Sequence, residues 1–73
     1  IMKWAAIDFE TANPSPMSAC AVGLTVFDEG EMVFSDSWLI RPHPYYDAFY
    51  PSFIDIHGIT PDWVAGAPLF TNV

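Results

Sequence analysis

The chain has 73 residues, of which 52% are hydrophobic and 16% aromatic, and nine acidic residues against two basic ones give it a formal net charge of −7. Affinity for phosphate groups comes mainly from Lys and Arg, so this balance argues against a nucleic-acid-binding surface within the segment itself. No run approaches the roughly 18 consecutive apolar residues of a membrane span, and no signal-peptide pattern is present, so we expect a soluble, cytoplasmic protein without membrane contacts.

Length and aromatic content together predict part of a larger domain. A domain of this size buries only about 60% of the surface that its unfolded chain exposes. Three Trp, three Tyr and six Phe are more core material than so short a chain easily encloses. We therefore expect residues 1–73 to be the amino-terminal fragment of a single domain, with no second domain and with an incomplete sheet through which molecules could associate.

Three apolar runs predict three strands. The first covers residues 3–10, contains aromatic and β-branched side chains and is expected to be buried. A proline-rich loop at residues 13–16 follows it. The second and third runs cover residues 18–27 and 32–40, and the polar, glycine-containing turn 28–31 between them is typical of an antiparallel hairpin.

The chain has one cysteine, Cys20, which lies in the second predicted strand. A single cysteine cannot form an internal disulfide. Its small apolar neighbours predict a buried apolar residue, and a reactive thiol is the alternative.

An aromatic loop is predicted after the third strand, because prolines at positions 42, 44 and 51 oppose regular structure there. Its aromatic residues form a cluster with Phe53 of the following segment, and the loop members are Tyr45, Tyr46, Phe49 and Tyr50. No Lys or Arg is interleaved with them, so we expect rings that anchor the loop to the sheet, with stacking on bases as the alternative. His43, between two prolines, is expected to be exposed.

Short helices are predicted in the last third of the chain. Residues 52–57 predict a helical turn that Gly58 ends. Residues 60–62 are typical of a helix start, with Thr at the cap, Pro at the first helical position and Asp in the first turn. Residues 67–70 predict the beginning of another helix.

Asp8 and Glu10 lie one residue apart near the end of the first predicted strand. Residues i and i+2 of a strand project from one face, about 6.5–7 Å apart along it, while Ile7 and Phe9 would face the core. Two carboxylates held this close repel each other, and a divalent cation such as Mg²⁺ or Mn²⁺ removes that conflict. Two such ions about 3.5–4 Å apart can hold the attacking and leaving oxygens of a phosphoryl transfer. The alternative is the solvated face of an edge strand.

Four segments of the chain together resemble a known family. They are "AIDFETAN" at residues 6–13, "SACAVGL" at 18–24, "IHGIT" at 56–60 and "APLFTNV" at 67–73. In order and approximate spacing they resemble the amino-terminal portion of the DnaQ-like (DEDD) 3′→5′ exonucleases, the group that includes the epsilon proofreading subunit of bacterial DNA polymerase III. The resemblance implies an α/β (α+β) fold of the ribonuclease-H-like kind, in which a three-stranded antiparallel meander precedes the aromatic loop and the short helices.

The resemblance also implies a function and a site. It implies an enzyme of DNA replication or repair that removes nucleoside monophosphates from a single-stranded or frayed nucleic-acid 3′ end, with DNA polymerase III as a candidate partner. Asp8 and Glu10 would be catalytic metal ligands for two Mg²⁺ or Mn²⁺ ions, with Asp8 bridging them. Phe9, Thr11 and His57 would contact the substrate. For His57 the alternative is a loop histidine that bonds a neighbouring carbonyl and holds the Gly58 turn.

The sequence departs from the family pattern in two ways. The family's Thr-Thr-Gly is replaced by Thr11, Ala12 and Asn13, and we expect Asn13 to tolerate a left-handed backbone in place of glycine. The remaining two acids and the general base of the family have no equivalent in these 73 residues, so we expect the fragment itself to be inactive. The alternative function is a non-catalytic protein-interaction module on the same scaffold.

Overall fold

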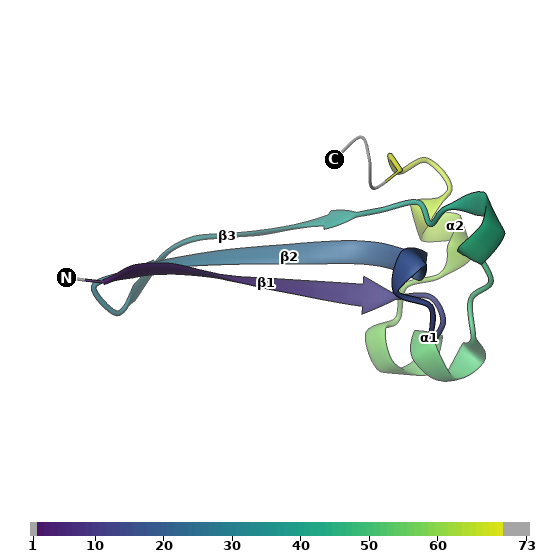
Figure 1. Ribbon diagram of the computed structural model, residues 1–73, viewed down its shortest axis with the longest axis horizontal. Coiled ribbons are helices and arrows are strands. Elements are labelled where there is room, and N and C mark those ends of the chain that lie inside the picture. The colour runs from purple at the N-terminus through teal and green to yellow at the C-terminus, as the bar shows by residue number, and fades with distance from the viewer. Residues whose placement is uncertain (1, 70–73) are drawn as a thin grey trace.

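Three antiparallel strands form the body of the protein. The computed structural model describes residues 2–69, with β1 at Lys3–Thr11, β2 at Ala19–Asp28 and β3 at Glu31–Leu39, in the sheet order β1-β2-β3. Figure 1 shows the helices gathered at one end of this sheet and the turn between β2 and β3 at the other. The predicted antiparallel meander is confirmed, and the molecule is a small domain of a kind compatible with the α+β class.

The turn between β2 and β3 is as short as a hairpin allows. Asp28 pairs with Glu31, so the turn itself consists of Glu29, with φ 53°, and Gly30, with φ 80°. Positive φ at both central residues is the type I′ geometry, whose twist matches that of the flanking strands. Glu29 is the one non-glycine residue with positive φ within residues 2–69.

Proline begins every helix within residues 2–69. These helices are two single 3₁₀ turns, η1 at Pro16–Ser18 and η2 at Pro44–Tyr46, and two short α-helices, α1 at Pro51–His57 and α2 at Pro61–Val64. Proline fits the first helical position because the amide it lacks has no intrahelical partner there. The helices predicted at 52–57 and from Pro61 are confirmed, although the Thr60 side chain makes no capping hydrogen bond.

The helix predicted at residues 67–70 is wrong for the part that the structure describes. Leu69 instead forms a parallel bridge with Arg41, and the Arg41 amide donates to the Pro68 carbonyl at 2.8 Å. Pro68 disfavours a helical backbone at the residue before it, and the chain following β3 supplies a partner for an extended segment. Phe70, the last residue of that prediction, lies outside the described residues.

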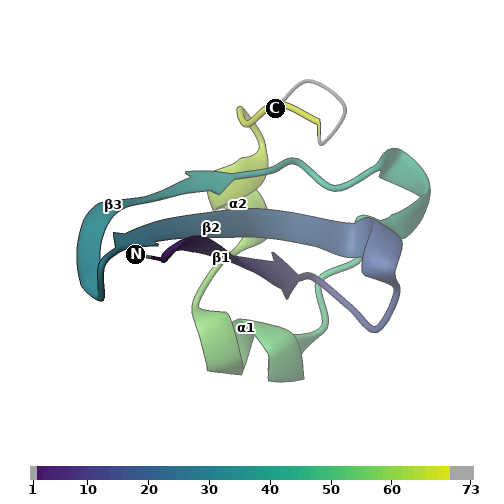
Figure 2. The ribbon, with the colours of Figure 1, turned by 60° about the vertical axis from the view of Figure 1, so that its left-hand side comes forward.

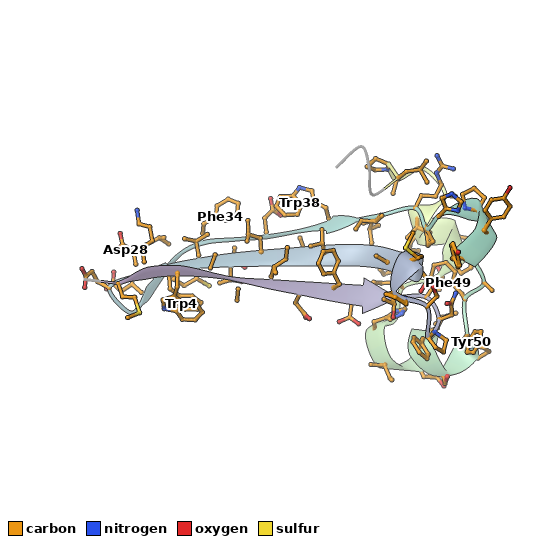
Figure 3. The ribbon with its side chains drawn as sticks, in the orientation of Figure 1. Trp4, Asp28, Phe34, Trp38, Phe49 and Tyr50 are labelled. Carbon is orange, nitrogen blue, oxygen red and sulfur yellow. The ribbon has the colours of Figure 1, made fainter. Side chains whose placement is uncertain are left out.

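The sheet has two different faces, because alternate residues of a strand project to opposite sides. One face, here named the acidic face, carries Asp8 and Glu10, with Gly23 and Ala21 paired opposite them on β2. Figure 3 shows Trp4 projecting from one side of the sheet and Phe34 and Trp38 from the other. The other face, named the apolar face, carries Ile7, Phe9, Val22, Leu24, Val26, Phe34 and Trp38.

The buried core is small and lies at the helical end of the sheet. Cys20, Ile59 and Val64 form its centre. Partly buried residues that pack against them are Ala21, Leu39, Phe49 and Ala67. The predicted burial of Cys20 is confirmed, because the residue is 0% exposed.

Much of the sheet lies outside this core. Ile7 is 63% and Phe9 40% exposed, so the prediction of a buried first strand with these two residues facing a core is wrong within residues 2–69. The reason is that the helices of residues 2–69 lie at one end of the sheet, and none of these helices lies over its middle (Figure 1). The radius of gyration of 13.9 Å accordingly exceeds the roughly 11 Å expected for a compact chain of this length.

Candidate functional site

Asp8 and Glu10 share the acidic face, near the end of β1. Asp8 pairs with Gly23 and is exposed, whereas Glu10 pairs with Ala21 and is half-buried at the border of the core. The surface beside Asp8 is open, because Gly23 has no side chain and a Cβ there would approach only the Asp8 backbone carbonyl, at 3.9 Å. The two carboxylates therefore lie beside small residues of β2, Gly23 and Ala21.

No basic group neutralises these two carboxylates within residues 2–69. The ion pair formed there, Lys3 with Asp28 at 4.0 Å, lies at the hairpin end of the sheet. No group of three or more His, Cys, Asp or Glu side chains in this part of the chain is arranged to hold a metal. Carboxylate oxygens suit Mg²⁺ or Mn²⁺, but such an ion requires about six ligands. Asp8 and Glu10 could thus supply some of the ligands of a divalent cation, and other groups would have to supply the rest.

His57 links the end of β1 to the turn that follows α1. Its Nδ1 accepts a hydrogen bond from the Ile59 amide at 2.9 Å, and its Nε2 lies 3.0 Å from the Thr11 carbonyl oxygen. An amide can only donate, so Nδ1 carries no proton, and a neutral ring then has its proton on Nε2, which donates to Thr11. Both ring nitrogens are occupied by the backbone, which matches the hydrogen-bonding alternative for this residue.

Asn13 is a structural residue whose role the sequence did not reveal. Its Nδ2 donates to the carbonyls of Tyr46, at 2.9 Å, and Ala48, at 2.7 Å, and its Oδ1 accepts from the Ser15 amide at 2.9 Å. The expected left-handed backbone is wrong, because Glu29 is the one non-glycine residue with positive φ within residues 2–69. The Ser15 contact is an Asx turn that the Asn-Pro-Ser sequence could have predicted, whereas the contacts to the aromatic loop have no local signal.

Residues 11–13 hold three parts of the chain together. His57 bonds to the Thr11 carbonyl, and the Tyr50 amide donates to the Ala12 carbonyl at 2.9 Å. Asn13 binds the aromatic loop through its side chain. The backbone directly after Glu10 is therefore fixed by the aromatic loop and by α1, which lies beside the end of β1 in both ribbon views (Figure 1, Figure 2).

Cys20 contacts the same strand end from β2. Its Sγ donates to the Glu10 carbonyl at 3.4 Å. Burial, and secondarily the negative charge of Glu10, raise the pKa of the Cys20 thiol from 9.0 to about 11. The thiol is therefore protonated at neutral pH, which agrees with the prediction of an unreactive buried residue.

Phe9 lies on the apolar face, so the structure does not bring it together with Asp8 and Glu10. It lines a cavity of about 400 Å³ at the helical end, within reach of segments that are distant in sequence. The lining residues are Phe9, Thr11, Pro16, Met17, Ala19, Ile40, Arg41, Pro42, His43 and Leu69. No local pattern predicts this cavity, because four separate segments build it.

Comparison of the chain with protein-family models, with curated proteins and with solved structures finds no match. The function is therefore argued from the chemistry of the residues themselves. The longest α-helix within residues 2–69, α1, has seven residues and is too short to cross a membrane.

Proposed function

We propose that this chain is the amino-terminal part of a DnaQ-like, metal-dependent 3′→5′ exonuclease domain, with Asp8 and Glu10 as two of its metal ligands. The observation that carries the proposal is the pair of carboxylates on one open face near the end of β1, without a basic partner within residues 2–69. A cation offers two adjacent anions the neutralisation that the described chain lacks.

In this proposal Mg²⁺ or Mn²⁺ supplies the activation of water and the stabilisation of charge in phosphodiester hydrolysis. Residues 11–13 hold the strand end in place next to Glu10. Thr11 and His57, which meet at that strand end, are assigned to the border of the pocket for the 3′-terminal nucleotide of a single-stranded or frayed end, with both His57 ring nitrogens kept on the backbone. Phe9 projects from the face opposite Asp8 and Glu10 and lines, together with Thr11, the cavity at the helical end, so its contact with the substrate would come from that side.

The exposed apolar face supports the view that the sheet belongs to a larger domain. Ile7, Phe34 and Trp38 are 63%, 45% and 41% exposed. An apolar surface of this kind is stabilised when further chain covers it. We propose that the same further chain supplies the remaining acids and the general base, so that residues 1–73 alone are inactive, and that the whole protein works with a replicative DNA polymerase.

A titration of the ¹⁵N-labelled chain with Mn²⁺ tests the metal site. The paramagnetic ion broadens the amide resonances of residues close to it, so residues 8–11 are expected to broaden at the lowest Mn²⁺ concentration. The double substitution Asp8→Asn with Glu10→Gln is expected to abolish that broadening, because it removes both carboxylates.

The matched control is Glu29→Gln with Glu31→Gln. It also removes two negative charges, but at the opposite end of the sheet. This variant is expected to keep the broadening at residues 8–11. Broadening confined to the hairpin turn, or persisting at residues 8–11 after both carboxylates are removed, contradicts the proposal.

A non-catalytic interaction module on the same scaffold is the second candidate, and the exposed apolar face favours it too. The two candidates differ in the acidic face. An interaction module needs no cation, so its Mn²⁺ titration shows no preference for residues 8–11.

A further inference from the structure

Two histidines of this chain use the same local hydrogen bond. The Nδ1 of His57 accepts from the Ile59 amide at 2.9 Å, and the Nδ1 of His43 accepts from the Tyr45 amide at 3.1 Å. The two differ in what else they touch. His57 also reaches the Thr11 carbonyl, 46 residues away in sequence, whereas His43 is exposed at the start of η2.

We propose that His57 is a pH-dependent clamp, which in its neutral form ties the end of β1 to the turn that leads into α2 and which releases that turn when Nδ1 is protonated. The hydrogen bond from Ile59 needs a lone pair on Nδ1. Protonation places an N–H there, opposite the N–H of Ile59, so the two groups become a pair of donors. Nε2 carries a proton in both forms, so its hydrogen bond to the Thr11 carbonyl remains. The protonated ring is then bonded to β1 but not to the turn.

The release reaches the core because Ile59 belongs to it. Ile59 is 7% exposed and packs with Cys20 and Val64. Without the bond from its amide to His57, the segment between α1 and α2 loses this hydrogen-bonded connection to β1. The inference uses neither a metal nor a substrate, so it stands or falls separately from the proposed exonuclease function.

The strands, the aromatic loop and the helices that His57 belongs to or borders carry other titratable side chains. They are Lys3, Asp8 and Glu10 on β1, Cys20 and Asp28 on β2, Tyr45, Tyr46, Asp47 and Tyr50 in the aromatic loop, Asp55 on α1 and Asp62 on α2. Carboxylates ordinarily titrate near pH 4, thiols and phenols above about pH 8, and histidine between about pH 5 and 8. The α-amino group also titrates in the range of histidine, so a change is assigned to His57 only where its midpoint equals that of the His57 ring resonances.

The test is a pH titration of the chain followed by NMR. Long-range ¹H–¹⁵N spectra of the His57 ring are expected to show the proton on Nε2 at high pH. The Ile59 amide and the Val64 methyl resonances are expected to shift on acidification with the same midpoint as the His57 ring. The Tyr45 amide is expected to follow His43 instead.

Two variants separate the histidines. His43→Gln removes the matched local bond and is expected to leave the shifts of Ile59 and Val64 unchanged. His57→Asn keeps an acceptor for the Ile59 amide, which is the Asn Oδ1, but it does not titrate and is too short to reach Thr11. In it the Ile59 amide shift is expected to be independent of pH between about pH 5 and 8.

A proton on Nδ1 at high pH, or an Ile59 amide that stays constant while the His57 ring titrates, overturns the proposal. The same holds if the Ile59 shift disappears in His43→Gln. If His57→Asn does not fold, the titrations of the unsubstituted chain and of His43→Gln decide by themselves.

Discussion

At the scale of single residues, two side chains hold the end of β1 that follows Glu10. Asn13 is 7% exposed and satisfies two backbone carbonyls of the aromatic loop, while His57 satisfies a third, that of Thr11. These hydrogen bonds are partly buried and contribute about 0.5–1.5 kcal/mol each, so together they favour one position of the loop. Neither residue needs to touch a metal or a substrate to influence the position of Glu10.

Substitution of Asn13 tests this role. Asn13→Ala leaves the Tyr46 and Ala48 carbonyls without a donor and is expected to lower the free energy of unfolding by about 1–3 kcal/mol. Asn13→Asp is expected to cost more at neutral pH, because a carboxylate accepts only and would face two carbonyl oxygens. Below about pH 4 the protonated carboxyl can donate once, so the difference between the two variants should narrow.

Urea unfolding followed by tryptophan fluorescence measures both costs. A cost for Asn13→Ala below about 0.5 kcal/mol would show that the two donor contacts contribute little, and equal costs for both variants at neutral pH would show that the carboxylate is not repelled.

Cys20 provides a second residue-scale prediction. Folding raises the pKa of its thiol from 9.0 to about 11. Between these two pH values the folded chain keeps the thiol proton, whereas the unfolded chain loses it. The contribution of Cys20 to stability is therefore complete below pH 9.0 and is lost as the pH rises toward about 11. At pH 8 a thiol reagent should react far more slowly with the folded chain than with the urea-unfolded chain, since the thiolate fraction is about 100-fold lower.

Cys20→Ala is the control for the stability measurement. It is expected to lack that part of the decline above pH 9.0 which the unsubstituted chain shows. Equal reactivity of the folded and unfolded thiol would contradict the burial on which the prediction depends.

At the scale of elements, the ends of the helices and the hairpin turn follow local backbone rules. Each helix within residues 2–69 begins at a proline, and α1 ends at His57, followed by the cap Gly58, whose φ of 73° is left-handed. Its amide donates to the Ile54 carbonyl at 2.7 Å, which closes the last turn of α1. The Gly58 turn places the next residue, Ile59, where its amide donates to His57.

Gly58→Ala and Gly66→Ala form a matched pair. An added Cβ meets no atom within 4 Å at either position, so sterics with neighbours do not distinguish them. Of these two glycines, only Gly58 has a positive φ, so Gly58→Ala should destabilise the chain by about 1–2 kcal/mol. Gly66→Ala should be neutral or stabilising by up to about 1 kcal/mol, because it lowers the entropy of the unfolded chain. Thermal unfolding measures both, and equal costs would contradict the left-handed cap.

At the scale of the whole molecule, the sheet has more apolar surface than the helices cover. The longest extent of the chain is 43 Å and the shortest 19 Å, and its core occupies one end. Aromatic side chains project from both faces, including Trp4, which stacks on Phe27 with ring centroids 4.2 Å apart. Contacts between neighbouring strands therefore carry much of the stability that buried side chains supply in larger domains.

Substitution of two isoleucines tests how the stability is divided between the core and the exposed face of the sheet. Ile7 is 63% exposed and Ile59 is 7% exposed. Ile59→Ala is expected to cost about 2–5 kcal/mol, as is usual for a buried isoleucine, and Ile7→Ala about 1 kcal/mol or less. Chemical denaturation at several protein concentrations measures both. A cost for Ile7→Ala as large as that for Ile59→Ala would show that the apolar face is covered, and dependence of that cost on concentration would identify a second molecule as the cover.

Much of the fold was predictable from sequence. Alternation of side chains, proline at the helix starts and glycine at the turns located the three strands and both α-helices, because each depends on the backbone preferences of near neighbours. The same patterns placed Asp8 and Glu10 on one face of β1. The helix expected from residue 67 failed where a distant segment intervened, because Arg41 offered extended residues a partner.

By itself the sequence determined which residues are extended, where the chain turns and that two carboxylates share a face. Only the tertiary structure decided that Asn13 and His57 bond to backbone 33 to 46 residues away, that Phe9 lines a cavity and that the apolar face stays exposed. The physical reason is the range of the interactions. Dihedral preferences act between neighbours, whereas hydrogen bonds and burial depend on which distant segments meet when the chain closes.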